Sequence, residues 1–128
     1  MPITLEWTGA EGRVLLLKYS DPVTWEQFDH AMDDGNNMLA QAPFDAVAIH
    51  DWRGVESRFF RRGMRDVLNK ALASPMNAVL TISLGGDPTI NRLVKTSLRL
   101  VRGRFQVCET LDEAYSLAED TLAGLEHA

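Results

Sequence analysis

The sequence has little of what marks secreted, metal-binding or membrane proteins. Its one cysteine, Cys108, cannot form an internal disulfide, so nothing points to an oxidising compartment. The histidines show no metal-ligand spacing with one another or with Cys108. No apolar run approaches the roughly 20 residues of a membrane span, and the start of the chain lacks the basic and then apolar layout of a signal peptide. We therefore expect a cytoplasmic protein without a metal or other cofactor.

Basic side chains are scarce in the first and last parts of the chain. Residues 1–50 hold two basic and eight acidic side chains, and residues 105–128 hold six acidic and none basic. Residues 51–104 hold eleven basic and four acidic ones. This pattern predicts either ordinary solvated helix faces or a charged contact surface. The sequence pI near 5.1 argues against nucleic acid as a partner.

The remaining composition is that of a folded domain. The chain has 128 residues, of which 45% are hydrophobic and 24% charged. This length is sufficient to bury a core without disulfides or metals. No linker or repeat interrupts it, so we expect one domain over residues 1–128.

Strand and helix patterns alternate along the chain. Apolar runs predict strands at 3–7, 14–19, 44–52, 78–84 and 104–109. Helical spacing predicts four helices, each following a capping residue: Thr24, Ser57, Asp87 and Thr110. The order ββαβαβαβα predicts an α/β fold, with a mostly parallel sheet of about five strands and about four helices. The opening hairpin places an antiparallel strand at or near an edge.

Three stretches carry a resemblance to a known family. They are VLLLKYSDPVTWEQFDHAM, AVAIHDWRGV and RFQVCETLDEAYSLAE. Together with the element order, they resemble the STAS superfamily, which includes the anti-sigma-factor antagonists and the domains attached to sulfate transporters. The resemblance implies a STAS-like mixed sheet and a non-catalytic regulatory or protein-interaction module. The Asp-Ser-Ser-Gly type phosphorylation motif is replaced by VESRFF, in which only Ser57 can be phosphorylated, so the resemblance is to a divergent branch.

The expected contact surface is the loop and helix start at residues 51–65, extended by basic helix faces. Ser57 is either an unmodified helix cap or a phosphosite whose phosphate lies beside arginines at the helix start. Such a surface attracts an acidic protein, an anionic membrane surface or the acidic helices of a second copy, which favours a homo-oligomer, most simply a dimer. The candidate residues are Asp51, Ser57, Arg58, Phe59, Arg61, Arg62, Arg65, Arg92, Lys95 and Arg99.

An alternative function is small-ligand binding, of a lipid or a nucleotide, in a crevice at the strand ends near Asp51, Trp52 and Gly85–Asp87. Asp51 there is either a base or ligand contact, or a carboxylate that pairs with Arg53. The GGDPT stretch is either a plain Asp-Pro helix start or a weak anion site formed by Gly85, Gly86 and Thr89. A hydrolytic enzyme ranks last, because Ser57 has no nucleophile-elbow motif and no evident base.

Overall fold

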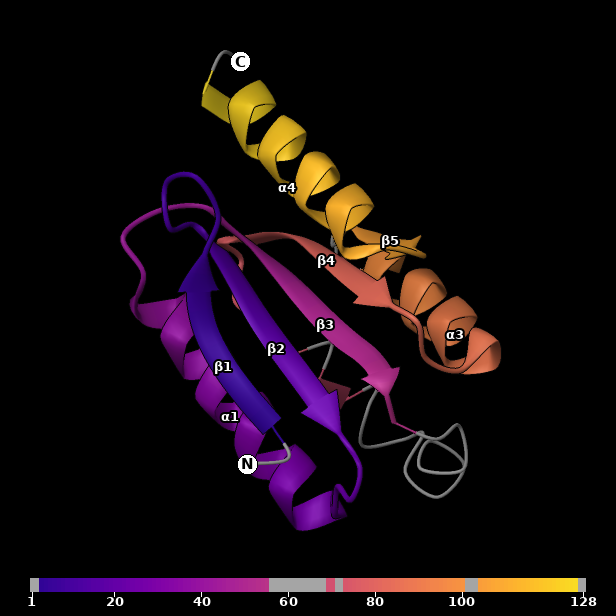
Figure 1. Ribbon diagram of the computed structural model, residues 1–128. Coiled ribbons are helices and arrows are strands. Elements are labelled where there is room, and N and C mark those ends of the chain that lie inside the picture. Colours follow the sequence, from indigo (N-terminus) through magenta and orange to yellow (C-terminus); the bar gives the residue numbers. More distant parts are fainter. Residues whose placement is uncertain (1–2, 56–68, 71–72, 101–103, 127–128) are drawn as a thin grey trace.

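The computed structural model describes residues 3–55, 69–70, 73–100 and 104–126 (Figure 1). Its sheet has the strand order β1-β2-β3-β4-β5, in which β1 and β2 are antiparallel and the other neighbours are parallel. The predicted α/β class, the mostly parallel sheet and the antiparallel edge strand are therefore confirmed. The strands are β1 (Ile3–Thr8), β2 (Val14–Ser20), β3 (Ala46–Gly54), β4 (Ala78–Leu84) and β5 (Phe105–Cys108).

Three helices are found within the described residues. They are α1 (Trp25–Gln41), α3 (Pro88–Leu100) and α4 (Leu111–Glu126). The fourth predicted helix, which follows Ser57, lies largely outside the described residues. No helix in the described ranges has the length and apolar character needed to cross a membrane.

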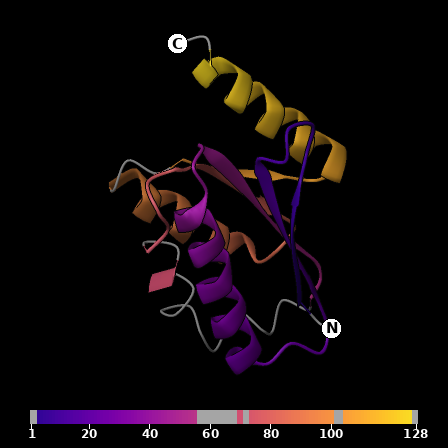
Figure 2. The ribbon, with the colours of Figure 1, turned by 90° about the vertical axis from the view of Figure 1, so that its left-hand side faces the viewer.

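The sheet separates two layers of helices. Helices α1 and α3 lie on one face and α4 lies on the other, as the two views together show (Figures 1 and 2). Each face has its own buried cluster: Phe28 and Ile90 belong to the first, and Ala114 and Leu122 to the second. The two clusters explain the apolar run in β2, because Leu15 and Leu17 point to the first layer and Val14 and Leu16 to the second.

Local capping fixes where the helices begin. Thr24 and Gln27 form the predicted capping box of α1. Asp87 accepts hydrogen bonds from the first amides of α3, whose first residue is Pro88 as predicted. Thr110 caps α4 through the Glu113 amide. The apolar stripe of α4 is buried as far as Leu122, while Leu125 is 44% exposed where the helix runs past the sheet (Figure 1).

Candidate functional site

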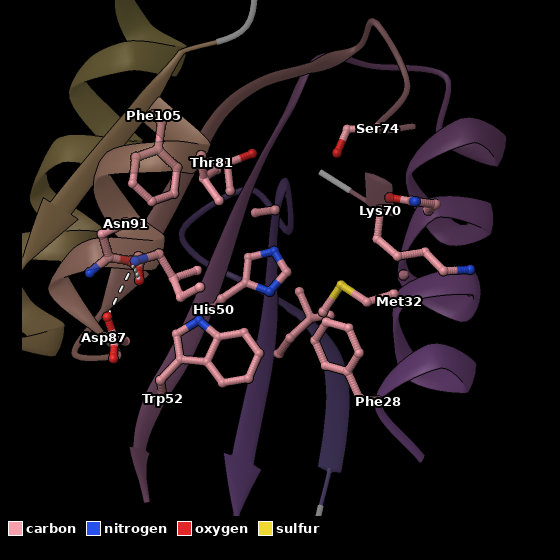
Figure 3. Close-up of a pocket in the computed structure, with 18 of the residues that line it drawn as sticks. Phe28, Met32, His50, Trp52, Lys70, Ser74, Thr81, Asp87, Asn91 and Phe105 are labelled. Atoms are coloured by element: carbon pink, nitrogen blue, oxygen red, sulfur yellow. Dashed lines mark hydrogen bonds between the residues drawn. The ribbon is translucent and has the colours of Figure 1, made fainter. Parts of the chain in front are cut away.

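A cavity lies on the first sheet face, between α1 and α3 (Figure 3). Its volume is about 60 Å³. One buried water needs roughly 10–15 Å³ by the same measure, whereas pockets for drug-sized ligands span roughly 300–1,000 Å³. The cavity therefore suits a compact ligand or the end of a longer one. Its apolar wall is formed by Leu17, Phe28, Met32, Leu39, Ala48, Trp52, Ile90, Val94 and Phe105.

Three parallel rings form one side of the site. The Tyr19 and Trp52 rings stack with centroids 3.8 Å apart and planes 5° apart. The His50 ring is nearly parallel to Trp52, with centroids 6.0 Å apart. The pleat accounts for this arrangement, because residues two apart in β3 share a face, and the parallel register pairs Leu17 of β2 with His50. The stack holds the imidazole in one orientation.

His50 is the central polar group of the cavity. Its Nδ1 lies 2.9 Å from the hydroxyl of Tyr19, while its Nε2 has no hydrogen-bond partner within the described part of the chain. Burial lowers the pKa of His50 from 6.5 to about 4, so the ring is neutral at physiological pH. Burial also raises the pKa of Tyr19 well above its usual value, which keeps its hydroxyl protonated. A neutral imidazole thus presents a nitrogen to the cavity (Figure 3).

Strand β4 supplies a second set of polar groups. Thr81 and Ser83 alternate with the apolar residues of this strand and line the cavity. The Ser83 hydroxyl is 2.9 Å from Oδ1 of Asn91 and 3.2 Å from the Gly85 carbonyl oxygen, so it joins the strand end to α3. The Thr81 hydroxyl has no such partner among the described residues. Gly85 and Gly86, with φ of 81° and 88°, make the turn that brings Asn91 back over the strand.

Lys70, Asn36 and Ser74 complete the polar lining of the cavity. Lys70 forms an ion pair with Asp33 of α1. Asn36 and Ser74 line the cavity and make no side-chain hydrogen bond within the described ranges. Several groups able to form hydrogen bonds therefore converge on a largely apolar space, which is the usual composition of a small-molecule site.

Asp51 is not part of this cavity. Strand β3 continues to Gly54, two residues beyond the predicted end at residue 52, so Asp51 is within the strand and points away from the face that holds His50 and Trp52. Arg53 donates to both carboxylate oxygens, from Nε to Oδ1 and from Nη2 to Oδ2, each at 2.9 Å. Of the two alternatives for Asp51, the structure therefore shows the carboxylate paired with Arg53 and not a free base.

The charge of Asp51 is stabilised locally. Desolvation alone would raise the pKa of Asp51, but the hydrogen bonds and charge of Arg53, together with the charge of Lys18, outweigh it and lower that pKa. The same bonds raise the pKa of Arg53. Asp51 is consequently ionised at neutral pH, and both of its carboxylate oxygens accept hydrogen bonds from Arg53.

The other predicted residues fall into two groups. Arg92, Lys95 and Arg99 lie on the exposed side of α3, as predicted, and form no ion pair among the described residues. The rest of the expected contact surface lies outside the described residues: Ser57, Arg58, Phe59, Arg61, Arg62 and Arg65. The structure therefore does not place the two basic sets relative to each other.

The proposed anion loop is already occupied by a side chain. The Thr89 amide donates to Oδ1 of Asp87 at 2.8 Å, and the Ile90 amide donates to the same oxygen at 3.3 Å. Because that carboxylate satisfies the amides and repels anions, the geometry favours the plain Asp-Pro helix start over anion binding at Gly85, Gly86 and Thr89.

Sequence reasoning placed a ligand crevice at the strand ends, whereas the cavity lies on the face of the sheet. Trp52, Gly86 and Asp87 line it as expected, but Asp51 does not. His50 was not among the candidate residues predicted from the sequence. The available signal was the polar residues at alternate positions of AVLTISL, because a fully buried strand has little reason to carry Thr81 and Ser83 on one face.

Comparisons with protein-family models, with curated proteins and with solved structures find no match. The resemblance to the STAS superfamily therefore stays a prediction from the sequence. Among the described residues, no group of three or more His, Cys, Asp or Glu side chains is placed to hold a metal ion.

Proposed function

We propose that this protein binds a compact small molecule in the cavity between α1 and α3. The observation that carries the proposal is the unpartnered Nε2 of His50, held at the cavity surface by the stack with Trp52 and by the bond to Tyr19. This nitrogen faces the cavity, so a ligand atom can satisfy it with a hydrogen bond that contributes about 0.5–1.5 kcal/mol net. Chemistry on the ligand is not part of the proposal.

A fragment screen by ligand-observed NMR tests this proposal, with two phenylalanine variants of α1 to locate the site. Asn36→Phe places an aromatic ring in the cavity, because Asn36 lines it. Asn37→Phe is the matched control, because Asn37 is the next residue and is exposed. We expect fragments that bind the native chain and Asn37→Phe but not Asn36→Phe. The absence of binding fragments, or fragments that still bind Asn36→Phe, would refute the proposal.

A second candidate function is the STAS-like interaction module predicted from the sequence. The observation that favours it is the exposed basic side of α3, with Arg92, Lys95 and Arg99 and no acidic residue from Pro88 to Leu100. Helix α4 exposes the opposite charge in Asp112 and Asp120. An acidic partner, or the α4 of a second copy, fits this side of α3.

Sedimentation velocity at low and high salt tests the self-association form of this second candidate. We expect the native chain to form a dimer or larger oligomer at low ionic strength that dissociates in salt. The double variant Arg92→Gln, Lys95→Gln should stay monomeric, and Asn37→Glu, Ala40→Glu, which changes the net charge by the same −2 at exposed positions of α1, is the charge-matched control. A monomer under every condition would exclude self-association and leave an acidic partner to be tested with the same variants.

A further inference from the structure

The protonation state of the cavity-facing nitrogen follows from the Tyr19–His50 pair. Tyr19 is 1% exposed, and Nδ1 of His50 is the one hydrogen-bond acceptor found for its hydroxyl in the described part of the chain. If Nδ1 carried a proton, the hydroxyl proton of Tyr19 would be buried without an acceptor, at a cost of about 1–3 kcal/mol. The hydroxyl therefore donates to Nδ1, and the neutral ring carries its proton on Nε2.

The Nε2–H group is consequently a donor with a fixed direction. The ring cannot turn without breaking the bond to Tyr19 and the stack with Trp52. Figure 3 shows the imidazole in the space between α1 and the strand that carries Thr81. A ligand atom that satisfies Nε2–H must be a hydrogen-bond acceptor, such as a carbonyl oxygen.

The charges around the cavity favour a neutral ligand. Lys70 and Asp87 are the charged side chains among the described lining residues. Lys70 pairs with Asp33, and Asp87 caps α3, so each already has its partner. Among the described lining residues, an ionised ligand group beside His50 would meet no free opposite charge to offset its lost hydration, which is strongly unfavourable.

The walls set the remaining features of the ligand. Phe28, Met32, Ile90 and Val94 offer apolar surface on the helix side of the cavity. The cavity volume of about 60 Å³ accommodates a small ring or a short branched chain rather than a nucleotide. The body of the ligand is therefore apolar and compact.

We infer that the cavity selects neutral, compact molecules with one carbonyl-type acceptor, which accepts a hydrogen bond from Nε2 of His50. This inference rests on the proposed function and specifies its ligand class. It disfavours both an anion and a nucleotide as the molecule that fills the cavity.

A matched set of probes tests the ligand class: cyclopentanone, cyclopentanecarboxylate and cyclopentylammonium share one ring and differ in the polar group. Dissociation constants come from NMR chemical-shift titrations of the native chain at neutral pH. We expect cyclopentanone to bind with a dissociation constant of about 1 mM, as suits so small a ligand. Both ions should bind at least about tenfold more weakly, because their charges must be desolvated. An ion that binds as tightly as the ketone overturns the inference while leaving the cavity as a ligand site.

Variants at the aromatic pair test the hydrogen bond itself. The double variant Tyr19→Phe, His50→Phe keeps three rings and leaves no buried hydroxyl without a partner. It should weaken cyclopentanone binding about threefold to tenfold, the effect of losing one neutral hydrogen bond. Tyr19→Phe alone keeps the imidazole but removes the hydroxyl that fixes its proton on Nε2, so its affinity should lie between those of the native chain and the double variant. Unchanged binding in the double variant overturns the assignment of His50.

Long-range proton–nitrogen NMR of the native chain provides a test that needs no variant. The spectrum identifies which imidazole nitrogen carries the proton, and we expect Nε2–H in the free protein and in the complex with cyclopentanone. A proton on Nδ1 overturns the inference. In another outcome, other fragments bind the native chain and fail to bind Asn36→Phe, while none of the three probes binds. In that case the ligand class is wrong and the proposed function stands. If nothing binds the cavity, the proposed function fails.

Discussion

The hydroxyl of Tyr19 and Nδ1 of His50 are 2.9 Å apart and join the two central strands β2 and β3 inside the first helix layer. Each group satisfies the other, and the Trp52 ring stacks against Tyr19 beside them. A buried polar pair in this position both stabilises the fold and orients a cavity-facing nitrogen.

Replacement of the tyrosine tests the stabilising contribution of this pair. Tyr19→Phe keeps the ring stack but leaves Nδ1 of His50 without its donor. We expect the free energy of unfolding to fall by about 1–2 kcal/mol, measured by urea denaturation at neutral pH. Tyr115→Phe, which removes the partly buried hydroxyl bond to Thr8 at 3.1 Å, is the comparison and should cost less. An equal cost for both would argue against a special role for the Tyr19–His50 bond.

The buried imidazole predicts a pH dependence of stability. His50 has a pKa of about 4 in the folded chain and near 6.5 when unfolded, so the unfolded state binds more protons between these values. Stability should therefore decrease as the pH falls from 6.5 to 4, by about 3 kcal/mol at most from this residue. Thermal unfolding across this range measures the slope.

His50→Phe, combined with Tyr19→Phe, removes the titrating group and should flatten the profile. The other ionisable side chains that line the cavity, Lys70 and Asp87, remain in both proteins and so cancel in the comparison. A variant with the same slope as the native chain would show that other groups cause the acid sensitivity.

The ion pair on the opposite sheet face yields a second pH prediction. Arg53→Met leaves the Asp51 carboxylate, whose side chain is 4% exposed, without its two guanidinium bonds. We expect a loss of about 1–3 kcal/mol at neutral pH. Because desolvation then raises the folded pKa of Asp51 relative to the native chain, the loss should shrink as the pH is lowered and the carboxylate is protonated.

Asp51→Asn in the Arg53→Met background separates charge from packing. The amide removes the buried charge, so the double variant should be more stable at neutral pH than Arg53→Met and lack its pH dependence. Chemical denaturation at neutral and acidic pH gives both values. A double variant that is as unstable as Arg53→Met would attribute the loss to the apolar part of the arginine.

Replacing Gly54 and replacing Gly124 by alanine should change the stability of the protein in opposite directions. A Cβ on Gly54 would lie 2.8 Å from the backbone oxygen of Tyr19, so Gly54→Ala must displace the end of β2 or β3. We expect a cost of about 1–3 kcal/mol. A Cβ on Gly124 in α4 meets nothing within 4 Å, and Gly124→Ala should stabilise by about 0.5–1 kcal/mol through helix propensity. Differential scanning calorimetry of both variants tests the pair.

Much of the fold could be predicted from local patterns. The strand VLLLKY and the capped helix after Thr24 are specified by residues close in sequence, and both were placed correctly. The predicted strand 44–52 stopped two residues short of the end of β3, because Arg53 is charged and Gly54 is a typical turn residue. In the structure, Arg53 pairs with Asp51 two positions earlier in the same strand. A pattern of apolar residues does not reveal such a pair.

The site was less accessible to sequence reasoning for a related reason. The cavity depends on which strands are neighbours and on the register that places Tyr19 beside His50, and both are properties of the assembled sheet. Asn77 illustrates the same limit, because its side chain donates to carbonyl oxygens of Leu39 and Phe44 and so fixes the exit from α1. No local signal in SPMN predicts that contact. Polar residues on buried strand faces are the feature from which such sites could be found.

The strand order has a consequence for how the protein is made. Each strand of the sheet pairs only with strands that are its neighbours in the chain, from β1 to β5. No strand has to be inserted between two others that already pair. During synthesis, every new strand can therefore add to the open edge left by the one before it, and the unpaired backbone edge of each nascent strand is exposed only until its successor arrives.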